Sequence, residues 1–271
     1  MCFAPYGRPV YADLIRDHLI DIRDDGSYAL DLSYFGYRDS LRMTNARWDA
    51  LFGGPAHSPE KAPTQKQMDL AASVQEVLEE VMLKMTRWLA RETGESALCL
   101  AGGVALNCVA NAKLAEDNAF DTIFIQPAAG DAGGALGAAL ALHQALNGER
   151  PFHPPGSDGM SGCHLGPTYH NDEIATILTK LGAQFEMVPL STIISHTAQA
   201  LADGRTVAWV QGRMEFGPRA LGNRSILADP RGVDVQRTLN LKIKFRESFR
   251  PFAPAVLREQ VEQWFEGENF S

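Results

Sequence analysis

Three arginines lie within a short glycine-rich stretch, residues 212–225, whose composition is typical of an anion site. They are Arg213, Arg219 and Arg224. Like charges at this density repel one another unless an anion lies among them. The planar guanidinium group pairs well with phosphate oxygens, so the stretch predicts a phosphate site.

A second group of positive charges follows in residues 241–250. Lys242, Lys244 and Arg246 alternate with other residues, so an extended chain would place all three on one face. We expect both basic stretches to be partly buried among apolar residues, where an unpaired cation is costly, so a phosphate site is favoured over a solvated basic surface. The apolar neighbours are Phe216, Ile226, Leu227, Phe245, Phe249 and Phe252.

Residues 101–107 form a further glycine-rich turn. Gly102 and Gly103 follow a predicted strand, where a ligand could approach the backbone and the amides of the next helix favour an anion. Asn107 could donate a hydrogen bond to a ribose or a phosphate. The pattern alone favours an ordinary strand-to-helix turn, because such turns abound in α/β folds.

Residues 130–134 form another such turn, with Asp131 directly before a predicted helix. Its carboxylate could ligate a hard or borderline cation, or it could cap the helix by accepting backbone N–H groups. Spacing alone favours the cap. The histidines and cysteines complete neither a metal spacing nor a catalytic triad.

The elements that would position these residues alternate between strands and helices. This rhythm predicts an α/β fold with a largely parallel sheet, which binds ligands where strands end and helices begin. We expect a first domain over residues 1–148, a linker rich in Gly, Pro and Ser over 149–162, and a second domain over 163–271. Expected helices cover residues 65–93, 104–116, 135–146, 172–181 and 193–202, and expected strands cover 28–35, 97–101, 122–126 and 206–210.

Composition excludes several classes of protein. The 271 residues are 45% hydrophobic and 21% charged, which excludes a mostly disordered chain. A net charge of −8 argues against nucleic-acid binding, whereas residues 205–258 hold eleven Lys and Arg against four Asp and Glu, which suits a small anion. We expect neither a signal peptide nor a membrane span. Four cysteines without a C-x-x-C pair predict reduced thiols and a cytoplasmic location.

Together these motifs resemble the O-carbamoyltransferase family of nodulation and antibiotic-tailoring enzymes, and the resemblance covers essentially the whole chain. The last three matching stretches are the most specific. The stretches are MCFAPYG at 1–7, AASVQ at 71–75, LAGGVALN at 100–107, QPAAGDAGGALGAA at 126–139, FGPRALGNRS at 216–225 and KFRESFRPFAP at 244–254.

The resemblance implies a fold and a reaction. The first domain would be the second half of an actin-like ATPase domain, similar to the tRNA threonylcarbamoyl transferase, and the second an incomplete α/β domain similar to threonylcarbamoyl-AMP synthase. ATP and carbamoyl phosphate would give carbamoyl-adenylate in the second domain. The carbamoyl group would then pass to a hydroxyl of a small molecule or oligosaccharide in the first. Mg²⁺ would accompany ATP, Fe²⁺ or a similar divalent ion would lie in the ATPase-like domain, and a homodimer is compatible with the family.

The resemblance also implies roles for individual residues, and it reverses the pattern-based preference at both glycine-rich turns. Asp131 would ligate the divalent metal, and Arg219, Lys244 and Arg246 would be catalytic. The residues that would bind the adenylate, carbamoyl phosphate or the ATP phosphates are Gly102, Gly103, Asn107, Gly133, Arg213, Asn223, Arg224, Ser225 and Arg250.

In the family, the stretch that matches residues 1–7 is internal, and the histidine metal ligands precede it. We therefore expect a fragment of a longer enzyme, truncated at both ends and inactive by itself. Two alternatives stay open. One is a relative of the tRNA threonylcarbamoyl transferase, which the negative net charge disfavours; the other is a nucleotide-binding module without its catalytic half.

Overall fold

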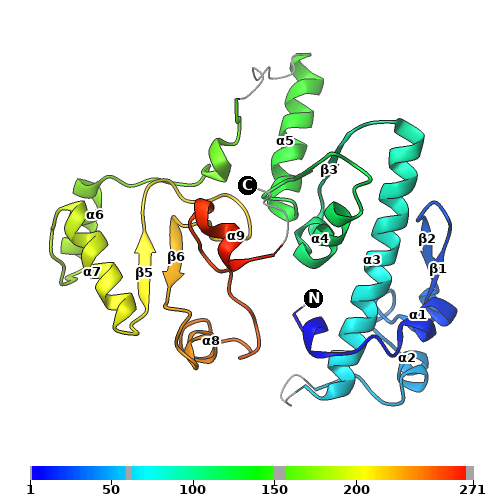
Figure 1. Cartoon of the computed structure of the whole chain (residues 1–271). Helices are drawn as coiled ribbons and strands as arrows, with labels where there is room; N and C mark the ends of the chain where they lie inside the picture. The colour runs from blue at the N-terminus through cyan, green and yellow to red at the C-terminus, as the bar shows by residue number, and fades with distance from the viewer. Residues whose placement is uncertain (1, 59–62, 149–156, 267–271) are drawn as a thin grey trace. The chain divides into compact units, whose positions relative to one another are not determined.

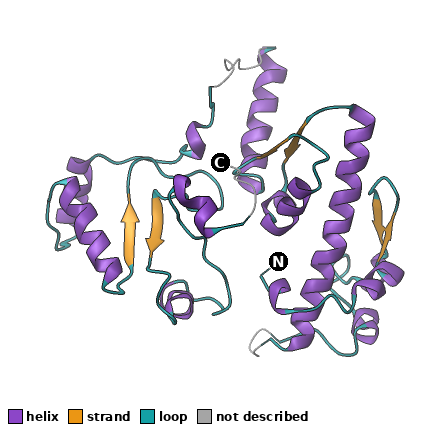
Figure 2. Ribbon diagram, viewed as in Figure 1, coloured by secondary structure: helices purple, strands orange, loops and turns teal. Residues whose placement is uncertain are grey.

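The computed structural model describes residues 2–58, 63–148 and 157–266, which divide into two compact units (Figure 1). The first unit comprises residues 1–100, 105–124 and 255–271, and the second comprises residues 101–104 and 125–254. Within the described residues, the strands form three two-stranded sheets among the helices (Figure 2). The mixed α/β class is thus confirmed. The likeness to actin-like and synthase-like domains and the domain boundaries stay predictions, and residues 149–156 of the predicted linker lie outside the described residues.

The long helix α3, Gln65–Thr93, lies at the centre of the first unit. At its start the backbone N–H of Thr64 donates to Gln67 Oε1 at 2.9 Å, in a capping box that satisfies amides the helix leaves open. At its end Gly94 adopts the left-handed conformation, with φ 65°, that favours glycine. Both predicted ends are confirmed.

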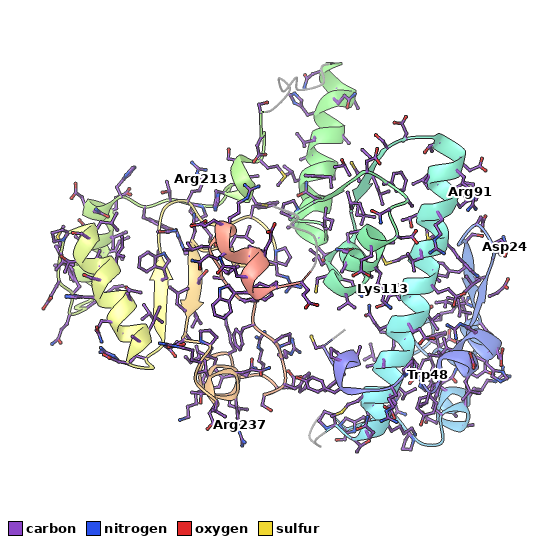
Figure 3. The ribbon with its side chains drawn as sticks, viewed as in Figure 1. Asp24, Trp48, Arg91, Lys113, Arg213 and Arg237 are labelled. Atoms are coloured by element: carbon purple, nitrogen blue, oxygen red, sulfur yellow. The ribbon has the colours of Figure 1, made fainter. Side chains whose placement is uncertain are left out.

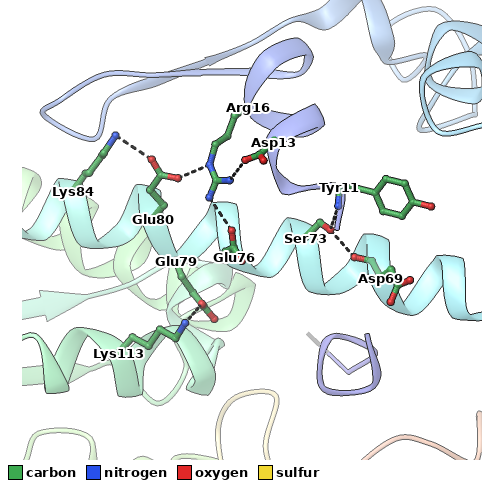
Figure 4. Close-up of polar contacts among 10 residues, drawn as sticks. All are labelled: Tyr11, Asp13, Arg16, Asp69, Ser73, Glu76, Glu79, Glu80, Lys84 and Lys113. Atoms are coloured by element: carbon green, nitrogen blue, oxygen red, sulfur yellow. Dashed lines mark hydrogen bonds and ion pairs between the residues drawn. The ribbon is translucent and has the colours of Figure 1, made fainter. Parts of the chain in front are cut away.

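Helix α1, Ala12–His18, packs against α3. Between them lies a small apolar core, and each of its larger side chains contributes about 1.5–3 kcal/mol on burial. Arg16 on α1 forms ion pairs with Glu76 and Glu80 of α3, at 2.9 and 2.8 Å, beside this core (Figure 4). The core residues are Ala12, Ile15, Leu19, Phe52 and Val77.

Short elements complete the first unit. Strands β1, Ile20–Ile22, and β2, Tyr28–Leu30, form an antiparallel hairpin, and helix α2 covers Ala46–Leu51. The strand expected over 28–35 is therefore shorter, because a 3-10 turn follows at Leu32–Tyr34, where Asp31 caps the chain through the N–H of Ser33. The 3-10 turn Ala4–Tyr6 and the helix α9, Val261–Trp264, also belong to this unit.

Strands β3, Ala97–Leu100, and β4, Thr122–Ile125, are confirmed close to the bounds that their apolar runs predict, and they pair with each other. The single helix expected over 104–116 is instead a 3-10 turn, Gly103–Leu106, followed by helix α4, Cys108–Glu116. The break has a local cause, because the Asn107 side chain accepts the N–H of Ala110 at 3.2 Å and so starts a new helix.

The second unit holds helices α5, α6 and α7 and the strands β5 and β6. Helices α6 and α7 are confirmed near their predicted ends, whereas α5 begins at Asp131, inside the predicted glycine-rich turn. The two strands pair antiparallel, with Val207 opposite Leu227. The β1–β2 hairpin is also antiparallel, so neither of these two pairs belongs to a parallel sheet. The alternation that predicts a parallel sheet concerns β3 and β4, and a parallel pairing of these two strands stays a prediction. The bounds are Asp131–Asn147 for α5, Asn171–Lys180 for α6, Leu190–Ala202 for α7, Val207–Val210 for β5, Arg224–Leu227 for β6 and Val235–Thr238 for α8.

The chain around residues 241–246 is not extended. A π-helical turn covers Leu239–Ile243, so the condition under which Lys242, Lys244 and Arg246 would share one face is not met. Among the described helices, none combines the length and the apolar character that a membrane span requires.

Candidate functional site: an arginine loop folded around a buried glutamate

The connection between β5 and β6, residues 211–223, is called the arginine loop here. A single carboxylate organises it. Glu215 is only 6% exposed, and its Oε1 accepts the backbone N–H groups of Leu221 at 2.7 Å, Asn223 at 2.7 Å and Arg224 at 3.2 Å. A carboxylate that accepts several N–H groups compensates for its own burial and fixes the chain around it.

The environment of Glu215 favours its charged form. Burial opposes ionisation, but the backbone hydrogen bonds outweigh it and lower the pKa of Glu215 to about 2. The residue therefore carries a negative charge inside the basic loop near neutral pH. Sequence reasoning assigned it no role, although a lone acid among three arginines was the available signal.

The side chains of Arg224 and Asn223 tie the two ends of the loop together. The Arg224 guanidinium donates to the carbonyls of Gln211 at 2.9 Å and Gly212 at 3.2 Å, and Asn223 Nδ2 donates to the carbonyl of Arg213 at 2.7 Å. Ser225 lies in β6 opposite Trp209. Arg224 and Asn223 thus already serve the fold, so contacts of these two side chains to a phosphate stay a prediction.

Arg213 and Arg219 are the exposed cations of the loop (Figure 3 labels Arg213). Within the described part of the chain, neither side chain forms a hydrogen bond or an ion pair. Because Glu215 fixes the backbone between them, these two guanidinium groups are held on an ordered loop and are available to an anion.

A second ordered basic segment covers residues 244–250, and Asn240 organises it. Asn240 is fully buried; its Nδ2 donates to the carbonyls of Ser248 at 3.1 Å and Arg250 at 2.8 Å, and its Oδ1 accepts Arg246 Nε at 2.6 Å. Arg250 pairs with Glu247 at 2.8 Å. Asn240 is another residue that the sequence reasoning missed, because its partners lie six to ten positions away.

The expected burial of the cations is confirmed only in part. Arg224 and Arg246 are half-buried, whereas the other four cations of the predicted site are exposed, and Phe245 is 85% exposed. The half-buried pair is satisfied within the chain, by carbonyls and by Asn240. The argument that burial of these cations demands a phosphate is therefore wrong for the exposed ones. Within the described residues, the six cations of the predicted site form no hydrogen bond or ion pair that joins the arginine loop to the segment 244–250. The exposed four are Arg213, Arg219, Lys244 and Arg250.

The glycine-rich turns of the second unit meet the arginine loop at Ala128 and Ala129, which are 0% and 5% exposed. The Gly102 N–H donates to the Ala129 carbonyl at 2.7 Å, and the Gly133 N–H donates to the Ala128 carbonyl at 2.8 Å. A Cβ atom on Gly217, in the arginine loop, would lie 3.2 Å from the Ala128 Cβ.

These contacts bring parts of three predicted motifs together. They also explain Gly133 without a ligand, since a Cβ there would lie 2.1 Å from the Ala128 oxygen. At Gly102 and Gly103, by contrast, a Cβ would meet nothing within 4 Å, so packing does not require glycine there, although Gly102 has a φ of 100°.

Asp131 is the first residue of α5, with an exposed side chain. Gly130 is the cap residue, so the predicted cap by the Asp131 side chain is wrong; its charge instead lies in the first turn, where it complements the helix dipole. Among the described residues, no group of three or more His, Cys, Asp and Glu side chains could hold a metal ion. The described residues therefore do not form the predicted metal site, and Asp131 as its ligand stays a prediction.

Asn107 lies in the first unit and its amide is buried there, 5% exposed. It donates to Gln75 Oε1 at 2.9 Å, and Gln75 donates to Glu79 Oε1 at 2.7 Å. Lys113 pairs with the second oxygen of Glu79 (Figure 4). A ligand could reach the Asn107 amide only by breaking its pair with Gln75, so the geometry gives Asn107 a structural role, and its nucleotide contact stays a prediction.

Comparison with known proteins identifies the class. The family model described as "Carbamoyltransferase N-terminus" matches residues 1–140, and the one described as "Carbamoyltransferase C-terminus" matches residues 198–271. The chain belongs to the carbamoyltransferase family, and the predicted resemblance is confirmed.

Three relatives illustrate this membership. A protein of Synechocystis sp. named "Uncharacterized protein sll1178" is 52% identical, over 98% of this chain and 43% of its own length. Nodulation protein NolNO of Sinorhizobium fredii is 40% identical, over 98% of this chain and 37% of its own length. The 3'-hydroxymethylcephem-O-carbamoyltransferase of Amycolatopsis lactamdurans is 33% identical, over 98% of this chain and 45% of its own length. The chain spans less than half the length of each of these relatives.

Proposed function

We propose that this chain is part of an ATP-dependent O-carbamoyltransferase. Its family includes a relative named for O-carbamoyl transfer to a hydroxymethyl group, which supports a hydroxyl as the acceptor. The structural observation that carries the proposal is the arginine loop, which presents Arg213 and Arg219 without partners among the described residues and is fixed by Glu215. Anionic phosphate groups are the ligands that such paired guanidinium groups favour.

The reaction has a simple balance. Carbamoyl phosphate, ATP and water give carbamoyl-adenylate, pyrophosphate and phosphate. The acceptor hydroxyl then forms a new C–O bond at the carbamoyl carbon, and AMP leaves with the electron pair of the broken bond. Adenylation is useful because a carbamate is a poor electrophile, and AMP makes a good leaving group.

The residues of the chain would act mainly through charge. Arg219, Lys244 and Arg246 would offset the negative charge that develops on phosphate oxygens, with Arg213 and Arg250 beside them. ATP would arrive as its magnesium complex. The acceptor, a hydroxyl-bearing small molecule or oligosaccharide, would be selected by other parts of the whole protein.

The test is an assay of the whole protein for carbamoyl transfer to a hydroxyl acceptor, with carbamoyl phosphate and ATP supplied. We expect product only when both are present. A matched control is Arg205→Ala, because Arg205 belongs to the same basic region but pairs with the exposed Asp203. Product formed without ATP, or from no combination of the two donors, would contradict the proposal.

A further inference from the structure

Phe245 combines an unfavourable backbone conformation with an exposed ring. Its φ is 49°, in the left-handed region that bulky side chains rarely adopt. Its side chain is 85% exposed, so the ring gains almost nothing from burial. Neither local backbone preference nor packing therefore explains a phenylalanine at this position.

The surrounding chain enforces this conformation. On either side of Phe245, the Lys244 N–H donates to the Leu239 carbonyl and the Arg246 N–H to the Asn240 carbonyl, both at 2.9 Å. The π-helical turn Leu239–Ile243 precedes it, and the fully buried Asn240 binds the chain that follows it. Strain that the surroundings impose in this way is typical of binding sites, and π turns recur there.

Positive charge flanks the exposed ring. Lys244 is exposed and forms no ion pair within the described residues, while the Arg246 guanidinium lies 4.9 Å from the Phe252 ring centre. The single carboxylate of the segment, Glu247, is paired with Arg250. An exposed aromatic face beside an unpaired ammonium group matches a ligand that has a flat ring and negative charge, as a nucleotide has.

We propose that Phe245 is a stacking platform for the adenine of ATP, and that Lys244 binds the phosphates of the same nucleotide. This inference rests on the proposed function, because it concerns the nucleotide that the reaction uses. Stacking of a base on an aromatic side chain strengthens binding by roughly fivefold to a hundredfold, and it requires no hydrogen bond from the protein.

The experiment measures the binding of ATP and of inorganic tripolyphosphate to the whole protein by calorimetry. Tripolyphosphate carries the charge of ATP without the base, so the two ligands separate stacking from charge. Phe245→Gly removes the ring and also relieves the left-handed strain, so it should fold with an unchanged or raised Tm. Phe245→Trp keeps a stacking face. Phe185→Ala, at a 41% exposed phenylalanine in another segment, is the matched control.

We expect Phe245→Gly to bind ATP about tenfold more weakly and tripolyphosphate as the unchanged protein does, and Phe245→Trp and Phe185→Ala to bind both normally. Lys244→Ala should weaken both ligands. If Phe245→Gly binds ATP normally while Lys244→Ala does not, the stacking role is wrong and the proposed function stands. If the unchanged protein binds neither ligand, both proposals fail.

Discussion

The Glu215 carboxylate accepts the backbone N–H of Asn223 at 2.7 Å, so a buried negative charge holds the loop that presents Arg213 and Arg219. The two exposed arginines do not bind this carboxylate. Glu215 thus accepts hydrogen bonds from the backbone and leaves the two guanidinium groups without partners among the described residues, as the proposed anion site requires. This division of roles is the basis of the predictions on the loop.

Replacing Glu215 should unfold the loop. Glu215→Ala leaves three partly buried N–H groups without their acceptor, and we expect it to reduce the free energy of unfolding by about 2–3 kcal/mol. Glu215→Gln keeps an acceptor oxygen but removes the charge, so its loss should be smaller. Urea unfolding of both variants measures the effect. If neither variant lost a measurable part of its free energy of unfolding, the carboxylate would not organise the loop.

The contribution of Glu215 should also depend on pH. Its pKa is lowered to about 2 in the folded chain, below the ordinary value of 4.5, so the folded state favours the charged form. The stabilisation is complete above pH 4.5 and is lost as the pH falls towards 2. Unfolding measured across this range should show a slope that Glu215→Gln reduces. An unchanged slope in that variant would assign the acid sensitivity to other groups.

The paired amides of Gln75 and Asn107 should stabilise the first unit. Gln75→Leu removes a donor to Glu79 and the acceptor of Asn107, leaving buried polar groups unsatisfied, at a cost of about 2–3 kcal/mol. Gln199→Leu, at an exposed glutamine, should cost little. A double-mutant cycle with Asn107→Leu measures the coupling. Strict additivity of the two substitutions would contradict the pairing.

Arg16 should stabilise the contact between α1 and α3 in a pH-dependent way. Burial opposes ionisation of Glu80, but hydrogen bonds from Arg16 and Lys84 outweigh it and lower the pKa of Glu80. Arg16→Met should therefore cost about 1 kcal/mol near neutral pH, since the pair is partly exposed, and less as the pH falls below the ordinary Glu value of 4.5 towards the lowered pKa of Glu80. Thermal unfolding of the variant and the unchanged protein at pH 7 and at pH 3 measures the cost at each pH. An equal cost at the two pH values would mean that Arg16 stabilises the contact by packing alone.

The sequence predicted features that depend on local chemistry and missed those that depend on distant partners. The ends of α3 follow from Thr64 and Gly94, which act within one turn. The conformation of residues 239–250 could not be predicted in this way, because the buried Asn240 donates to carbonyls up to ten residues away. No periodicity reports such contacts.

In the candidate site, too, local features could be predicted and contacts with distant residues could not. The arginines and glycines were visible from their spacing, because local density of charge and of glycine is a sequence property. The exposure of the arginines could not be predicted from the sequence. The burial of Asn107 against Gln75 could not be predicted either, because the two residues are thirty-two positions apart. Glu215 was visible as a residue, but its role emerged only once three backbone N–H groups were seen to converge on it.

The most direct test of the central claim is the exchange of labelled pyrophosphate into ATP by the whole protein, which reports formation of the adenylate without any acceptor. The account predicts exchange that requires carbamoyl phosphate, persists in Arg205→Ala, and falls at least a hundredfold in the combined Arg219→Ala, Lys244→Ala variant. Exchange at the unchanged rate in that combined variant would contradict it.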